Sequence, residues 1–393
     1  MKKTGVNGLH IKQRNRGLVL RLIACGEADS RMELTRLTGL TKMTVTNIVG
    51  EFLDEGYLEE REVQKNRKRG CNPVRLALSA ATPKVLALSL ARDKIEAALV
   101  DFSGKICSSV AAVPLKGETA ESLQEKLVLT AKETLAQAED RILGVGVASI
   151  GPVHAGKGLL LNPVNFFGIT DFSIKNVLEE ALKLPVAVNN DMNAAALAER
   201  LYGEGKKYEN FVYLGITNGI GAGVIANGTL YYNPSGFSGE VGHMSIQMDG
   251  RPCFCGNHGC LETYASIPVV SRELKDACGL AYVPEPREFI QLYQTPAGRR
   301  VFEAMEEKLE AGLVNLANLF SPQAILVGHD GCYLPDEMFK RMEEVLNRRV
   351  LFAGCQEVSL HRSSFQNDAL LLGAACCVLQ QVFDGGMGII NEK

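Results

Sequence analysis

Four potential metal ligands lie close together in one stretch of this chain, and they must converge if they bind a single ion. The stretch is rich in glycine and proline, so it is expected to form a loop and not a packed helix or strand. The four residues are His243, Cys253, Cys255 and Cys260. Three thiolates and one imidazole close a tetrahedral zinc site without a position for substrate, so we predict a structural zinc ion. The alternative is a set of buried thiols without a metal, since cysteine is often a core residue.

Two carboxylates flank these ligands in the sequence. Glu240 and Glu262 are not needed to complete the predicted Cys3His set. Folding the loop around a zinc ion would fix both side chains in space. We therefore expect the metal to organise a binding site and not to perform chemistry itself.

The length and the cysteine pattern limit the class of protein. A chain of 393 residues suffices for two or three domains. No stretch approaches the roughly 18 apolar residues of a membrane span, and the first residues lack the apolar core of a signal peptide. The eleven cysteines are mostly scattered singly, unlike a secreted disulfide framework. The expectation is a cytoplasmic protein with reduced thiols.

The charge is distributed unevenly along the chain. Residues 1–80 carry 15 Lys+Arg and 9 Asp+Glu, whereas the remainder carries 27 and 36. A basic head on an acidic body suits a polyanionic partner of the head. A charge run by itself, however, is usually only a solvated surface.

The head has the pattern of a winged helix-turn-helix domain. Helical spacing of apolar residues covers 15–26, a short helix follows Ser30, and a third helix begins after Thr41. The third helix has one apolar stripe, which leaves small polar and basic side chains on its outer side, as in a helix that enters the DNA major groove. The residues of this helix expected to contact DNA are Lys42, Met43, Thr44, Thr46 and Asn47.

A basic loop follows between two expected strands, 57–60 and 74–78. Four of the seven residues in 64–70 are cationic. We predict a wing that contacts phosphates or the minor groove through Arg67, Lys68 and Arg69. The alternative is a three-helix core with a solvated hairpin that serves protein contacts.

From about residue 84 strands and helices alternate, which is typical of an α/β fold. Two similar hairpins, near 85–102 and 210–226, suggest two related lobes with a cleft between them. A helix is expected from Ala194 to Tyr202. The predicted domains are 1–80 (DNA-binding head), 81–190 (first lobe) and 191–393 (second lobe with the zinc loop, its C-terminal helix returning to the first lobe).

These motifs resemble the ROK family (repressors, open reading frames and sugar kinases), whose body is an actin-like, ribonuclease H-like sugar-kinase fold. The resemblance covers nearly the whole length. The head is similar to that of the family's repressors over 30–49, and the body matches at 151–153, 189–196, 239–243 and the cysteine cluster. It implies a sugar-responsive repressor of carbohydrate-utilisation genes that binds a double-stranded DNA operator as a homodimer or a dimer of dimers.

The resemblance also implies which side chains hold a sugar or sugar phosphate. These are Gly151, Asn162, Asn190, Asp191, Glu240, His243 and Glu262. His243 is expected to use one ring nitrogen for zinc and the other for the sugar or a carboxylate. Three of these residues have a structural alternative: Asp191 as the N-cap of the helix near Ala194, and Asn190 and Glu262 as partners of local loop hydrogen bonds.

In family kinases the counterpart of Asp191 is the general base, but the nucleotide-binding turns of this chain are altered. The kinases carry Asp-x-Gly-Gly-Thr where this chain has residues 89–93, Ser-Leu-Ala-Arg-Asp, and the turn at 327–331 lacks consecutive glycines. The turn at 217–223 keeps its glycines, for which hairpin conformation is an alternative reason. We therefore predict a regulator with a vestigial Asp191 and no catalytic residues. The alternatives are an ATP-dependent sugar kinase with a DNA-binding head, and a regulator that responds to a protein partner.

Overall fold

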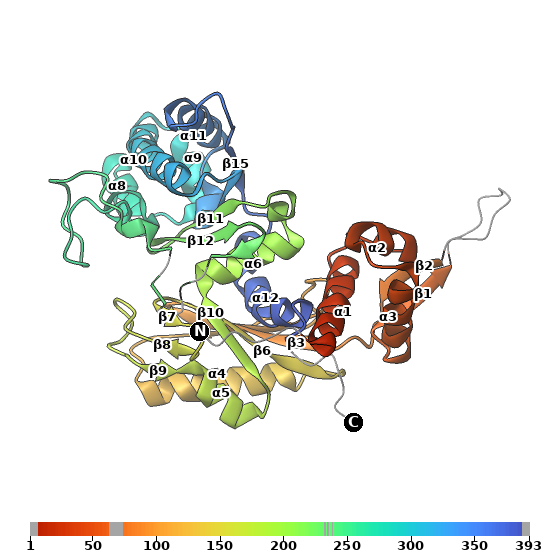
Figure 1. Cartoon of the computed structure of the whole chain (residues 1–393). Helices are drawn as coiled ribbons and strands as arrows, with labels where there is room; N and C mark the ends of the chain where they lie inside the picture. The colour runs from red at the N-terminus through yellow and green to blue at the C-terminus, as the bar shows by residue number, and fades with distance from the viewer. Residues whose placement is uncertain (1–6, 63–73, 232, 234–235, 238, 387–393) are drawn as a thin grey trace. The chain divides into compact units, whose positions relative to one another are not determined.

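The structure is a computed structural model that describes residues 7–62, 74–231, 233, 236–237 and 239–386 (Figure 1). The predicted wing contacts Arg67, Lys68 and Arg69 lie outside the described residues. The chain divides into two compact units, Met1–Asn189 with Ala374–Lys393 (unit 1) and Asn190–Gly373 (unit 2). The finer division into three domains at 80 and 190 remains a prediction. No helix of the described part is long and apolar enough to cross a membrane.

Three capped helices and a two-stranded hairpin form the head, which belongs to unit 1. Their bounds are α1 Gly8–Ala24, α2 Arg31–Thr38, α3 Lys42–Asp54, β1 Leu58–Glu62 and β2 Val74–Leu78. The side chains of Ser30 and Thr41 accept backbone N–H bonds at the starts of α2 and α3, as expected of N-caps. Helix α1 starts earlier than the predicted residue 15, because Asn7 caps a first turn that carries no apolar periodicity.

The head packs against the C-terminal helix α12 (Ala369–Phe383) within unit 1. A Cβ on Gly17 of α1 would lie 2.2 Å from the carbonyl oxygen of Phe383, so only glycine permits this approach. Aromatic rings continue the contact: Phe102 lies 6.1 Å from Phe383 and 6.3 Å from Tyr57, between ring centroids. The helix-turn-helix is therefore packed onto the body and not merely tethered to it.

The sheet of unit 1 has the strand order β10-β6-β3-β4-β5. Its strands are β3 Lys84–Leu90, β4 Lys94–Val100, β5 Ala111–Pro114, β6 Ile142–Ser149 and β10 Val186–Asn190. Helices α4 (Ala120–Leu135) and α5 (Ile174–Leu182) share a core with Val145 and Val147 of β6. The alternating residue Gly146 turns to the other face, where an added Cβ would lie 1.8 Å from Ala374 O of α12. A small sheet, β7 (Val153–His154), β8 (Leu159–Leu160) and β9 (Phe172–Ser173), completes this unit.

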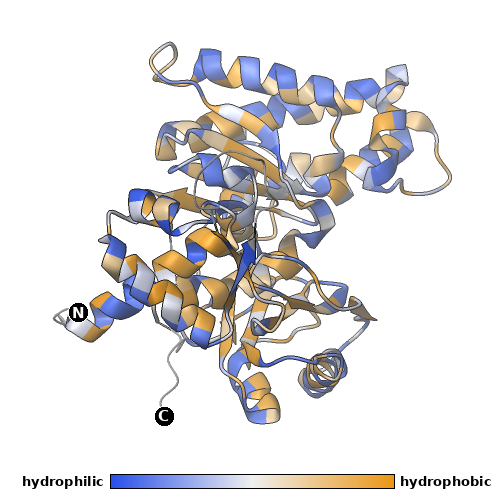
Figure 2. Cartoon of the chain, turned by 90° about the vertical axis from the view of Figure 1, so that its right-hand side faces the viewer, coloured by the Kyte–Doolittle hydropathy of each residue, from blue (hydrophilic) through white to orange (hydrophobic). Residues whose placement is uncertain are grey.

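The sheet of unit 2 has the order β13-β12-β11-β14-β15. Its strands are β11 Phe211–Ile216, β12 Ile220–Ala226, β13 Thr229–Leu230, β14 Ala324–His329 and β15 Ser359–Arg362. Helices α8 (Ile267–Cys278), α10 (Pro296–Phe320) and α11 (Asp336–Arg349) pack on one face, and α6 (Asp191–Tyr202) packs on the other. The helices carry hydrophobic and hydrophilic residues in alternation, as helices with one buried face require (Figure 2).

The two sheets repeat one plan. In each sheet, the first strand of an antiparallel hairpin also pairs, on its other side, with a later strand that runs parallel to it. Strand β3 pairs antiparallel with β4 and parallel with β6, and β11 pairs antiparallel with β12 and parallel with β14. The prediction of an α/β fold built from two related lobes is therefore confirmed.

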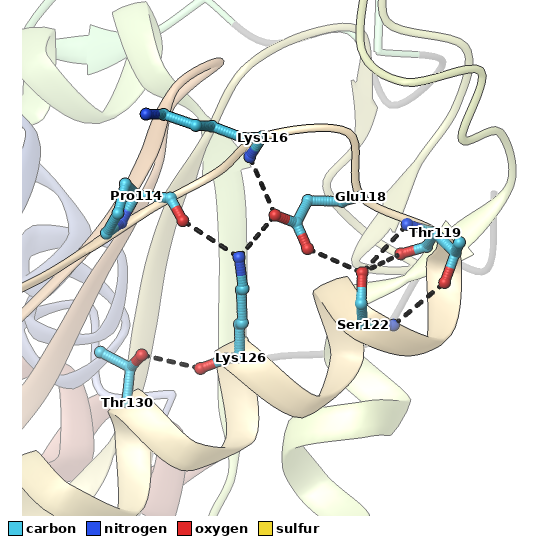
Figure 3. Close-up of polar contacts among 7 residues, drawn as sticks. All are labelled: Pro114, Lys116, Glu118, Thr119, Ser122, Lys126 and Thr130. Carbon is cyan, nitrogen blue, oxygen red and sulfur yellow. Dashed lines mark hydrogen bonds and ion pairs between the residues drawn. The ribbon is translucent and has the colours of Figure 1, made fainter.

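Glu118 ties the edge strand β5 to the start of α4 (Figure 3). Its carboxylate accepts hydrogen bonds from Lys126 Nζ (2.5 Å), Ser122 Oγ (2.7 Å) and the backbone N–H of Lys116 (2.9 Å). Lys126 Nζ also donates to Pro114 O at the end of β5, at 3.1 Å. Chiefly because of Lys126, and then of Ser122, the pKa of Glu118 falls to about 2. The ionised carboxylate thus stabilises the connection between β5 and α4 in unit 1.

We expect Glu118→Gln to lower the midpoint of thermal unfolding at neutral pH by about 1–3 °C, because charge-assisted hydrogen bonds are lost from a covered position. The folded pKa of about 2 lies below the ordinary value of 4.5, so this contribution is present above pH 4.5 and is lost as the pH falls from 4.5 toward 2. The difference in unfolding free energy between wild type and E118Q, measured with urea, should therefore shrink from about pH 5 to about pH 3.

Glu125 is the matched control, since it is exposed on the same helix. We expect E125Q to behave as wild type at each pH. An E118Q deficit that stays constant over this pH range would contradict the assigned role of the charge.

Candidate metal centre and ligand-binding residues

The four predicted metal ligands meet in unit 2. One ligand atom from each of His243, Cys253, Cys255 and Cys260 lies within 4.8 Å of all the others. Cys255 Sγ is 3.7 Å from Cys260 Sγ, and Cys253 Sγ is 3.6 Å from His243 Nδ1. A tetrahedral zinc ion with ordinary bond lengths would separate two sulfurs by about 3.8 Å, and a sulfur from a nitrogen by about 3.6 Å. The donor set, and these two distances, therefore fit a tetrahedral metal site.

The backbone of the loop holds the ligands in place. Cys253 N–H donates to Asn257 O at 2.9 Å, and Leu261 N–H donates to Met244 O at 3.0 Å. Gly259 has φ +68°, and a Cβ there would lie 1.7 Å from Gln247 O. The turn is thus closed by main-chain contacts that only glycine allows at this position.

Arg251 fastens the loop to the helices that follow it. Its guanidinium lies 4.7 Å from the ring centroid of Tyr264, donates to Thr263 O at 2.9 Å and pairs with Glu273 at 2.9 Å. Its backbone N–H donates to Tyr264 Oη at 2.7 Å. A cation and an aromatic residue 13 positions apart have no periodic signature, so this contact cannot be predicted from the sequence pattern.

The three thiols differ in their electrostatic environment. Burial raises the pKa of Cys253 to about 12 and also raises that of Cys260, whereas the backbone N–H of Asn257 lowers the pKa of the exposed Cys255. The two buried thiols are therefore protonated at neutral pH without a cation. A bound divalent ion would supply the positive charge that makes all three thiolates favourable.

Glu262 lies between the metal ligands and the β11–β12 turn. It is the first residue of α7 (Glu262–Ala265), and its Oε1 is 3.4 Å from Cys253 Sγ and 3.5 Å from His243 Nδ1. On the other side, a Cβ on Gly219 would lie 3.2 Å from Glu262 Oε2. Glu262 is not one of the four predicted ligands, but its carboxylate contacts two of them. Sequence spacing alone gives no sign of this contact.

The segment 239–243 lies along β12 through its glycines. A Cβ on Gly239 would lie 1.9 Å from Ala222 O, and one on Gly242 would lie 2.3 Å from Ile220 O. This backbone contact fixes the short helical turn Val241–His243.

Glu240 precedes that turn and is exposed. Although its side chain reaches solvent, partial loss of water around the carboxylate raises its pKa; His243 opposes this rise and Glu262 adds to it. The pKa of Glu240 thus depends on this partial burial and on two neighbouring residues.

Helix α6 begins at Asp191 and not near Ala194 as predicted. Asn190 is its N-cap, because its Oδ1 accepts from Met192 N–H at 3.0 Å and Asn193 N–H at 3.4 Å. Asp191 Oδ1 accepts from Met192 N–H at 2.8 Å, and its charge is favourable in the first helical turn. The N-cap of α6 is therefore Asn190 and not Asp191, the alternative considered for Asp191 from the sequence. Asparagine and aspartate are about equally favourable as N-caps.

The seven candidate sugar ligands are divided between the two units. Gly151 and Asn162 belong to unit 1, where Asn162 is exposed just after β8. The other five, Asn190, Asp191, Glu240, His243 and Glu262, belong to unit 2. The structure brings His243 and Glu262 into contact. The assignment of all seven residues to a sugar remains a prediction.

The β3–β4 turn is filled by its own side chains. The Arg92 guanidinium donates to Val164 O, and Ala91 N–H donates to Lys94 O at 2.9 Å. Ser89 is fully buried, with its Oγ 3.5 Å from Glu96 Oε2. Residues that would face a phosphate in a kinase here serve the local packing of unit 1.

The glycines of the β11–β12 hairpin make room for Met192 of α6. A Cβ on Gly215 would lie 2.1 Å from Met192 Sδ, one on Gly221 would lie 2.9 Å from Met192 Cγ, and one on Gly223 would lie 2.3 Å from Met192 O. The packing of α6 thus requires these glycines whether or not a nucleotide binds. This requirement is a second structural reason for them, besides the conformation of the hairpin.

His329 occupies the end of β14, where the kinase pattern has consecutive glycines. Its Nδ1 is 2.8 Å from Tyr213 Oη, and burial lowers its pKa to about 4. A Cβ on Gly328 would lie 1.9 Å from the same hydroxyl oxygen. This turn therefore carries a neutral imidazole bound to a core tyrosine.

The outer side of α3 carries the predicted DNA contacts. Lys42, Met43, Thr46 and Asn47 are exposed, whereas Thr44 is only partly exposed. Thr44 Oγ1 is 2.9 Å from Thr41 Oγ1, and Thr44 N–H donates to the same atom at 3.1 Å. The backbone and side chain of Thr44 are thus engaged by the N-cap residue Thr41 at the start of the helix.

Comparisons with known proteins agree with this architecture. The profile of the ROK family matches residues 85–381. A xylose repressor of Caldicellulosiruptor bescii is 29% identical, over 95% of this chain and 97% of its own length. A crystal structure of a ROK family transcriptional regulator, described as a homologue of Escherichia coli Mlc, has a TM-score of 0.82 and 26% identity, over 96% of this chain and 98% of its own.

A ROK hexokinase from Thermus thermophilus has a TM-score of 0.65 and 32% identity, over 77% of this chain and 99% of its own. The family profile spans most of the chain, and both regulators and kinases align with it over nearly their full lengths. On this evidence the chain belongs to the ROK family.

Proposed function

We propose that this protein is a sugar-responsive, DNA-binding transcriptional repressor. One observation supports this function above the others: the relatives named as a repressor and a transcriptional regulator match 95% and 96% of the chain, head included. The hexokinase matches 77%, a share that the body alone accounts for. The helix-turn-helix in the head is what distinguishes the two classes of relative.

The head is proposed to bind a double-stranded DNA operator through α3 and the basic wing. A helix with a capped N-terminus and an exposed polar face is the element that enters the major groove. Two copies of the chain would read two half-sites, so a homodimer or a dimer of dimers on a pseudo-palindrome is expected.

The body is proposed to bind a sugar or sugar phosphate through the seven candidate residues. Carboxylate, amide and imidazole groups suit sugar hydroxyls, because each hydroxyl both donates and accepts a hydrogen bond. The sugar can change operator affinity only if it binds one arrangement of the protein more tightly than the other. Release from DNA on sugar binding is the expected direction.

The metal is proposed to be a structural zinc ion. The Cys3His donor set suits zinc, and it leaves no open coordination position. The ion would hold His243 and the loop beside Glu262, where two candidate sugar ligands meet.

A kinase function is the second candidate, because kinases align with the body. Phosphoryl transfer depends on positioning the triphosphate and stabilising its charge. Arg92 and Ser89, at the first turn and in the strand before it, form hydrogen bonds within the protein, and His329 occupies the third turn. These contacts favour the regulator.

The direct test is selection of duplex DNA by the purified full-length protein, followed by a sugar panel. We expect a specific sequence to be bound, and one sugar or sugar phosphate to weaken that binding. An ADP-release assay with ATP and the same panel is expected to give no turnover. Sustained turnover that is lost in Asp191→Asn would establish the kinase instead.

Zinc is expected at about one ion per chain in protein purified without chelator, as measured by inductively coupled plasma mass spectrometry. Because Cys260 is fully buried among the ligands, Cys260→Ser should lose most of this zinc. The control is Cys355→Ser, at an exposed cysteine outside the cluster, which should keep it. Full zinc occupancy in C260S would remove Cys260 from the site.

A sugar at 100 times its Kd stabilises the folded protein by about 2.7 kcal/mol and so raises the unfolding temperature. If Asp191 contacts the sugar, Asp191→Asn is expected to weaken binding and abolish this rise. Asp249→Asn is the control, since Asp249 is an exposed carboxylate of the same unit. A normal thermal shift in D191N would exclude Asp191 from the sugar contacts. Silence of wild-type protein across the whole panel would favour a protein effector.

A further inference from the structure

The outer face of α3 has an unusual composition. Its buried face consists of Val45, Ile48, Val49 and Phe52. At 100° per residue, Met43, Thr46, Asn47 and Gly50 lie on the opposite face, with Gly50 near its centre. This face therefore combines a thioether, a hydroxyl, an amide and a bare stretch of backbone.

Met43 exposes an apolar side chain on an otherwise polar face. Its exposed fraction is 75%, so it takes little part in the core of the head. The main apolar group that major-groove DNA presents is the 5-methyl group of thymine. A contact between the Met43 side chain and that methyl group would remove both apolar surfaces from water.

Asn47 lies one helical turn after Met43 and is exposed. Within the described part of the chain its side chain has no hydrogen-bond partner, unlike that of Thr44, which bonds to Thr41. A free amide offers one donor and one acceptor side by side. This pair matches N6 and N7 of adenine in the major groove.

Among the described residues, no neighbour explains by packing why position 50 is a glycine. A Cβ added there would meet nothing within 4 Å, and its backbone is helical without positive φ. Glycine in a helix interior is less stable than alanine. Another molecule that closely approaches the backbone at position 50 would explain why this residue is a glycine.

The charges around this face limit what can approach it. Lys42 is exposed at the start of α3, where the helix dipole is also positive, whereas the exposed Asp54 lies one turn beyond Gly50. A polyanion is therefore attracted to the first two turns and repelled beyond them. Double-stranded DNA meets this pattern and also supplies the base edges.

We infer that α3 reads an adenine and a neighbouring thymine in each half-site. Asn47 hydrogen-bonds to adenine N6 and N7, Met43 contacts the thymine 5-methyl group, and Gly50 lets the helix lie deep in the major groove. This inference rests on the proposed DNA-binding function and specifies its base preference.

The first experiment selects duplexes from a random pool with full-length wild-type protein, then replaces single bases in the selected site. Deoxyuridine for the critical thymine removes only the methyl group and should weaken binding about fourfold. In Met43→Ala this replacement should have no effect. 7-Deazaadenine for the critical adenine should weaken wild-type binding roughly tenfold and leave Asn47→Ala unaffected.

The second experiment uses Gly50→Ala, which separates folding from recognition. The substitution should raise the unfolding midpoint by about 1–3 °C, because alanine favours the helix. It should also weaken operator binding at least tenfold, because the added methyl group meets the duplex. Gly8→Ala is the matched control, a helical glycine with equally open space. We expect it to leave operator affinity unchanged.

The outcomes distinguish this inference from the proposed function. If wild-type protein selects no sequence, the repressor function itself fails. If it selects a sequence but G50A binds as wild type, or M43A remains sensitive to deoxyuridine, the base-reading assignment is overturned while the repressor function stands.

Discussion

The β11–β12 hairpin is the element on which all ligand-binding candidates of unit 2 depend. Met192 of α6 fills the space beside its glycines, and the segment 239–243 lies along the backbone of β12. Thr217 O in its turn accepts a hydrogen bond from Ile267 N–H, directly after α7. One hairpin thus fixes Asp191, the metal loop and Glu262 relative to one another.

The same hairpin explains how a family with kinases can include a regulator. Its glycines are kept because α6 packs on them, so they persist whether or not a phosphate is bound. The corresponding turn in unit 1 has no such constraint, and there Arg92 bonds to Val164 O. In the proposed function, sugar binding and nucleotide binding would therefore depend on different contacts. The second can be lost without disturbing the scaffold of the first.

Sequence patterns predicted the features that arise from local physics. The N-caps Ser30 and Thr41, the apolar stripe of α3, the alternation of strands and helices and the cluster of four candidate metal ligands are all recognisable from residue type and spacing. Features that depend on tertiary approach are not. The contact of Glu262 with two metal ligands and the stacking of Arg251 on Tyr264 follow from how the loop folds back, which no periodicity encodes. Helix α6 starts earlier than predicted, because Asn190 caps it and the polar residues Asp191 and Asn193 belong to its first turn.

The central claim is that sugar binding in the body and operator binding in the head are coupled. Coupling between two ligands is reciprocal at equilibrium, so it can be measured from either side. Isothermal titration of the cognate sugar into free protein and into the protein–operator complex tests it most directly. The account predicts weaker sugar binding to the complex, by the same factor by which the sugar weakens operator binding. Equal sugar affinity in the two titrations would contradict it.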